Sequence, residues 1–146
     1  MVATNCSAQI ESAAKSVFSL TTFRKDGTLL ASTHGVFVGD KGEAISSWKP
    51  FVGADSAVVI DSKGKQSVVS ALIGANELYN VCKFKVDGNT QPASVATAAS
   101  KKGEKVWILQ YSVNKPLIDQ RNVQSVEPFM SKYSYYIFSS NVPDNT

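Results

Sequence analysis

Residues 80–86 have the sequence Asn-Val-Cys-Lys-Phe-Lys-Val, which is typical of a β-strand with one buried face. Successive side chains of a strand point to opposite faces. One face therefore carries Asn80, Cys82, Phe84 and Val86, and the other carries Val81, Lys83 and Lys85. The two lysines predict that the second face meets water.

Similar runs, rich in Val, Ile, Phe, Tyr and Thr, recur along most of the chain between turns centred on glycine. They predict strands at 17–24, 29–38, 43–48, 56–61, 66–73, 80–86, 105–111, 117–127 and 133–139. No internal repeat of about 20–50 residues is visible, so a propeller or solenoid is not expected. The sequence predicts an all-β fold built from short antiparallel strands.

The segment 87–104 separates six expected strands from three, and its small and polar residues are typical of a surface connection. Six antiparallel strands can close into a barrel without an exposed edge, whereas three cannot. We therefore predict a complete first barrel with a leading helix over 10–86 and a partial second barrel over 105–146. A further C-terminal segment or another chain would supply the missing strands.

A short helix is predicted before the first strand, because Ile10, Ala13, Ala14 and Val17 share one face at helical spacing. Glu11 would lie in its first turn, where the helix dipole favours an acid. Residues 1–9 are expected to be an N-terminal arm or the remnant of an export signal. The small and polar residues around Cys6 resemble a signal cleavage region, although the charged and apolar parts of a signal peptide are missing.

Composition excludes several classes of function. With 43% hydrophobic and 18% charged residues, the 146-residue chain is globular rather than disordered. Its net charge of +3 includes no basic run longer than Lys101-Lys102, so no nucleic-acid partner is expected. No stretch approaches the roughly 20 apolar residues of a membrane span. Two cysteines, Cys6 and Cys82, and one histidine predict no metal site, no cofactor and free thiols.

The order of several segments resembles the HtrA-type branch of the trypsin-like serine proteases, from about residue 14 to the end. The matching segments are Thr33-His34-Gly35-Val36-Phe37-Val38, Asp40 to Pro50, Gly53-Ala54-Asp55, Asn80 to Val86, and Gly103-Glu104-Lys105-Val106. The resemblance implies a trypsin-like double β-barrel, with the first six-stranded barrel complete and the second truncated.

The resemblance also implies where catalytic residues should be. When these segments are aligned with those of the family, the catalytic histidine falls on Lys49 and the catalytic aspartate on Asn80. The nucleophilic serine would follow residue 146. A lysine ammonium has no lone pair with which to accept the serine proton. An asparagine cannot stabilise a positive partner as a carboxylate does. No catalytic residue is therefore predicted, and Lys49 and Asn80 are interpreted as degenerate triad positions.

Three functions stay open on the sequence. The leading hypothesis is a catalytically inactive, exported protease-like domain of the bacterial periplasm or cell surface, which binds a peptide or protein or serves as a structural module. The first alternative is an active trypsin-like serine endopeptidase whose nucleophile lies beyond the end of this chain. The second is a small β-barrel that binds a ligand or nucleic acid. The oligomeric state is not predicted.

Other candidate groups have structural interpretations. Lys49 could form a serine–lysine dyad with Ser46 or Ser47, but this requires a positioned serine and a desolvating pocket. His34 is expected to be an ordinary strand residue, and Trp48 could either cover a cleft or pack at the barrel end. The aromatic residues Tyr133, Tyr135, Tyr136 and Phe138 could form a stacking platform or fill the second barrel.

Overall fold

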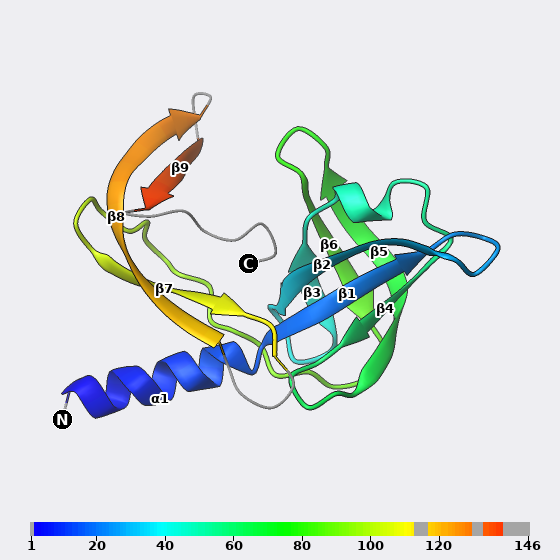
Figure 1. The fold of residues 1–146 in the computed structure, drawn as a ribbon, viewed down its shortest axis with the longest axis horizontal. Coiled ribbons are helices and arrows are strands. Elements are labelled where there is room, and N and C mark those ends of the chain that lie inside the picture. The colour runs from blue at the N-terminus through cyan, green and yellow to red at the C-terminus, as the bar shows by residue number, and fades with distance from the viewer. Residues whose placement is uncertain (1, 113–116, 130–132, 139–146) are drawn as a thin grey trace.

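The computed structural model describes residues 2–112, 117–129 and 133–138, of which 2–7, 129, 133–135 and 137 are described by their backbone alone. Figure 1 shows a barrel, a smaller sheet beside it and one helix. The elements are α1 (Val2–Ala14), β1 (Val17–Phe23), β2 (Leu29–Phe37), β3 (Glu43–Ser46), η1 (Lys49–Phe51), β4 (Ser56–Ile60), β5 (Gln66–Asn76), β6 (Val81–Val86), β7 (Lys105–Gln110), β8 (Leu117–Phe129) and β9 (Tyr133–Phe138). The predicted all-β fold is confirmed.

The first six strands form a closed antiparallel barrel in the order β1-β2-β3-β6-β5-β4. Strand β6 shows how the sequence pattern directs side chains into the barrel or toward solvent. Cys82, Phe84 and Val86 are buried while Val81, Lys83 and Lys85 are exposed, as the alternation predicts. The inward side chains of the strands and of Phe51 on η1 form one core, which consists of Phe18, Leu20, Phe37, Ala44, Phe51, Ala57, Val59, Cys82, Phe84 and Val86.

Close packing of this core requires glycine at position 35 of β2. A Cβ built on Gly35 would collide with the ring of Phe18, and it would lie 2.6 Å from the carbonyl oxygen of Ile45. Phe18 is fully buried and its ring contacts those of Phe37 and Phe84, with centroids 4.7 and 5.9 Å away. Because Gly35 has no side chain, the backbone of β2 can lie close to the ring of Phe18 in the core.

The predicted helix was wrong in its extent. Helix α1 runs from Val2 to Ala14, so Glu11 lies near its end rather than in its first turn. Val17 begins β1 instead of continuing the helical face. Val17 satisfies both a helical and a strand pattern, and its pairing with Val36 of β2 decides between them. None of the helices in the described part of the chain has the length and apolar character needed to cross a membrane.

The last three strands form a separate antiparallel sheet in the order β7-β8-β9. The connection from the barrel is attached to the turn between β2 and β3. Thr90 donates its hydroxyl hydrogen to the Gly39 carbonyl at 2.6 Å and accepts the Gly42 N–H at 3.0 Å. The Ala93 N–H donates to the Phe37 carbonyl at 2.9 Å. The connection thus follows the barrel surface before it enters the second sheet.

Candidate functional site

Lys49 and Asn80 meet at one end of the barrel. Lys49 begins η1, the short helical turn after β3, and Asn80 ends the turn that joins β5 to β6. The Asn80 side-chain oxygen Oδ1 accepts the backbone N–H of Lys49 at 2.7 Å. The Asn80 carbonyl accepts the backbone N–H of Trp48 at 3.3 Å. Two segments about thirty residues apart in sequence are therefore joined by both the side chain and the backbone of one asparagine.

Asn80 has an unusual backbone conformation, with φ of 50°. Among the described residues it is the only one other than glycine with positive φ. Asparagine adopts this left-handed region more readily than most residues, because its short polar side chain can hydrogen-bond locally. This conformation also explains why β6 starts at Val81 and not at Asn80, where the sequence placed its first residue.

The Lys49 side chain itself is exposed to solvent. The neighbouring Pro50 occupies the first turn of η1, where its missing N–H costs nothing. Trp48 stacks on Phe51, with ring centroids 6.2 Å apart and planes inclined by 11°. Trp48 therefore packs at the barrel end against the core, and this contact accounts for its position without a role in covering a cleft.

Ser46, one of the two serines near Lys49, does not form a dyad with it. Ser46 is buried, and its hydroxyl donates to the Ser47 carbonyl at 3.0 Å while lying 3.6 Å from the Cys82 sulfur. The Ser46 hydroxyl thus faces the core and not the exposed lysine. Burial raises the pKa of the Cys82 thiol above its ordinary value, although a hydrogen bond with Ser46 opposes this effect. Cys82 is a free, buried thiol, while the side chain of Cys6 lies outside the described residues.

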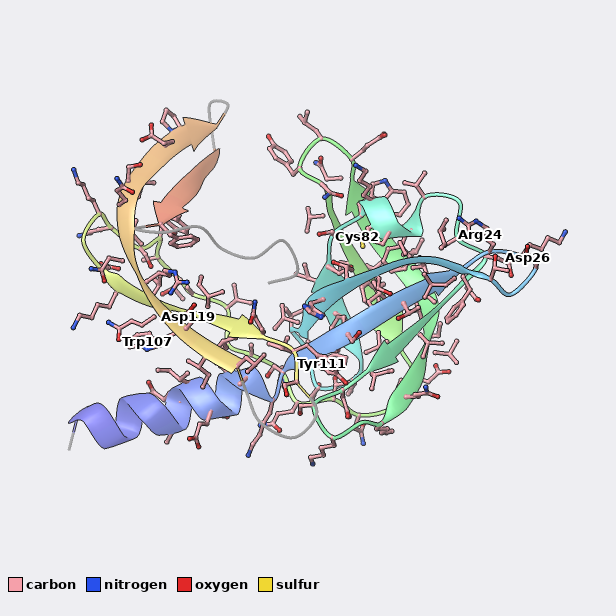
Figure 2. The ribbon with its side chains drawn as sticks, viewed as in Figure 1. Arg24, Asp26, Cys82, Trp107, Tyr111 and Asp119 are labelled. Atoms are coloured by element: carbon pink, nitrogen blue, oxygen red, sulfur yellow. The ribbon has the colours of Figure 1, made fainter. Side chains whose placement is uncertain are left out.

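His34 lies on β2 and pairs with Ser19 of β1. Its ring contacts that of Tyr111, with centroids 5.7 Å apart. Tyr111 follows β7 and donates its hydroxyl hydrogen to the Asp61 carbonyl at 3.2 Å. Burial, with a smaller contribution from the Asp61 charge, raises the pKa of Tyr111. Through these contacts Tyr111 joins the end of β7 to the barrel, and Figure 2 shows its place between the two. The sequence placed Tyr111 at the end of a strand and predicted no contact for it.

The aromatic residues of β9 are described only in part. Tyr136 accepts the Ser100 N–H at 3.0 Å through its hydroxyl oxygen, and its ring lies 6.3 Å from that of Phe138. The side chains of Tyr133 and Tyr135 lie outside the described residues. Within the described part of the chain, no three His, Cys, Asp or Glu side chains lie close enough together to hold a metal ion.

A solved structure has a similar architecture. The crystal structure of the serine endoprotease from Yersinia pestis matches it with a TM-score of 0.68 at 18% sequence identity. The fold is that of a trypsin-like protease. The match covers 82% of this chain and 44% of that protein, so this chain spans less than half the length of the Yersinia protein. No family model and no curated protein matches the sequence.

Proposed function

We propose that this chain is a catalytically inactive trypsin-like domain that binds peptides or proteins without cleaving them. The observation that carries the proposal is the hydrogen bond from the Lys49 backbone N–H to the Asn80 side-chain oxygen at the barrel end. The family resemblance assigns the catalytic histidine and aspartate to these two positions. Their adjacency in the fold agrees with that assignment, since a proton relay needs its members within hydrogen-bond reach.

The chemistry of the two side chains supports inactivity. In the trypsin-like mechanism a neutral imidazole takes the serine proton and returns it to the leaving amine. The Lys49 side chain is exposed, and a lysine ammonium has donors but no acceptor. Asn80 uses its side-chain oxygen to accept a backbone N–H and bears no negative charge. Neither group can perform the proton transfer that the triad requires.

The second sheet supports a role in contact with other chains or segments. Strands β7 and β9 are its edges, and each pairs with one neighbour only among the described residues. Trp107, Leu117, Ile118 and Val126 on this sheet are exposed apolar side chains. Unpaired edges and apolar surface are usually covered in folded proteins. We propose that a further segment or a partner chain completes this sheet, and that the protein acts outside the cytoplasm of a bacterium.

The test is a cleavage and binding assay on the longest form of the protein that the cell produces. The protein is incubated with unfolded, fluorescently labelled casein, with trypsin as a positive control. We expect binding without release of labelled fragments. Cleavage that a serine-directed inhibitor abolishes would overturn the proposal and favour the alternative of an active endopeptidase.

A further inference from the structure

The barrel closes through a short pairing between β4 and β5. The two strands pair only through Val58 to Ile60 of β4 and Gln66 to Val68 of β5. Strand β5 then continues to Asn76 with β6 on one side, while no described strand pairs with its other edge. Eight residues of β5, 69–76, therefore present one unpaired backbone edge about 26 Å long.

A notch of about 200 Å³ lies where β4 and β5 diverge. Its apolar lining consists of Phe51 of η1, Val69 and Leu72 of β5, and three alanines, Ala54, Ala57 and Ala71. Its polar lining consists of Asp55, Ser56 and Ser70. Leu72 pairs with the buried Phe84 of β6, so the register places it on the inward side of the barrel. It is nevertheless 53% exposed, because β4 has already diverged from β5 at this level.

The size and composition of the notch restrict what it can bind. Small-molecule sites usually have about 300–1,000 Å³, so the notch fits one large side chain better than a whole ligand of that class. The unpaired edge of β5 offers backbone donors and acceptors at strand spacing, which an extended peptide can satisfy by strand addition. The combination indicates a peptide that pairs with β5 and places one apolar side chain over Phe51 and Leu72.

Charge at the mouth of the notch adds a second requirement. Asp55 lines the notch, and its side chain is exposed. Its backbone N–H donates to the Phe23 carbonyl, which fixes the residue beside the start of β4. Within the described residues its carboxylate forms no ion pair. A lysine or arginine of the incoming strand would complement this carboxylate, whereas an acidic residue would be repelled.

We infer that the notch between β4 and β5 is a docking site for an extended peptide segment of a partner protein, with one large aliphatic residue and a nearby basic residue. This inference specifies the ligand and the location for the binding role proposed above, and it rests on that role. It uses a surface formed by β4, β5 and η1, and neither Lys49 nor Asn80 lines it.

The experiment measures binding of a fluorescein-labelled peptide, Lys-Thr-Thr-Leu-Thr-Val-Thr, by fluorescence anisotropy. The variant Leu72→Asp places a charge in the notch, and Val68→Asp is its matched control. Val68 lies on the same strand, is 55% exposed, pairs with Val58 of β4 and does not line the notch. We expect Leu72→Asp to weaken binding at least about tenfold and Val68→Asp to leave it within about twofold of the wild type.

Two further arms test the chemistry of recognition. Asp55→Asn should weaken binding about two- to fivefold at low salt, and the difference should disappear at high salt. A peptide with its central residues N-methylated keeps its side chains but loses backbone donors, so it should fail to bind. Equal binding of the methylated peptide would overturn strand addition, and equal affinity of the Leu72 and Val68 variants would overturn the notch as the site.

The casein assay distinguishes failure of this inference from failure of the proposed function. If casein binds the wild type and both β5 variants equally without being cleaved, the binding role stands and the notch is wrong. If casein is cleaved, the inactive function fails whatever the peptide does. Sedimentation of the unliganded protein completes the test, because a dimer that Leu72→Asp disrupts would assign the notch to a second copy and overturn the peptide inference.

Discussion

Asn80 provides the sharpest test of the barrel end, because its side chain and its backbone make separable contributions. Asn80→Ala removes the acceptor of the Lys49 N–H and leaves a residue with a Cβ at φ of 50°. One such hydrogen bond contributes about 0.5–1.5 kcal/mol, and the left-handed conformation costs an ordinary residue about 1–2 kcal/mol, part of which asparagine also pays. We expect the free energy of unfolding to fall by about 1–3 kcal/mol.

Two companion variants separate these terms. Asn80→Gly loses the same hydrogen bond but adopts positive φ freely, so it should lie within about 1 kcal/mol of the wild type. Asn80→Asp keeps an acceptor oxygen and should be as stable as the wild type at pH 7. Urea unfolding, followed by tryptophan fluorescence and circular dichroism, gives the order of stability of the three variants and the wild type. The reasoning fails if the alanine variant is as stable as the wild type, or if glycine proves worse than alanine.

Three other predictions follow from the packing. Gly35→Ala should lower the free energy of unfolding by about 1–3 kcal/mol in urea melts, because its Cβ meets a core ring and a backbone carbonyl; unchanged stability would refute the close approach. In a Cys6→Ser background, Cys82 should react with a thiol reagent much more slowly in the native protein than in urea, because burial shields the thiol and raises its pKa; equal rates would show that the core is open. The pKa of Tyr111 is raised in the folded state, so its contribution to the free energy of unfolding should be complete below about pH 10 and be lost as the pH rises above that value. Alkaline melts should show this loss in the wild type and not in Tyr111→Phe.

The strands could be predicted from the sequence because their signal is local. Alternation of period two identified the buried face of β6, and glycine-centred turns separated most of the neighbouring strands correctly. The extent of α1 was not predictable in this way. Residues 2–9 are mostly small or polar, so their helical signal is weak, and Val17 fits the helical spacing although it pairs in the barrel.

The features on which the proposals rest depend on register between distant segments. The hydrogen bond from Lys49 to Asn80 needs the β5–β6 turn to meet η1, which no pattern within either segment specifies. Strand β5 runs past residue 73, where the sequence ended it, because irregularities in its pairing with β6 accommodate the extra residues. The notch exists only because β4 diverges from β5 after three pairs, so Leu72 resembles a core residue in sequence and is half exposed in the fold.

The hydrogen bond at the barrel end places different demands on positions 49 and 80. The contact at position 49 comes from a backbone N–H, which every residue except proline provides, so its side chain is free to change. Position 80 must supply a short acceptor and adopt positive φ, which restricts it to asparagine and aspartate if both are to be kept. Under the proposed assignment, asparagine in place of aspartate at position 80 would remove the charge that proton transfer needs and would preserve the bond that holds η1 beside the β5–β6 turn. Phe51 of η1 also lines the notch between β4 and β5, so the same bond supports the proposed peptide site.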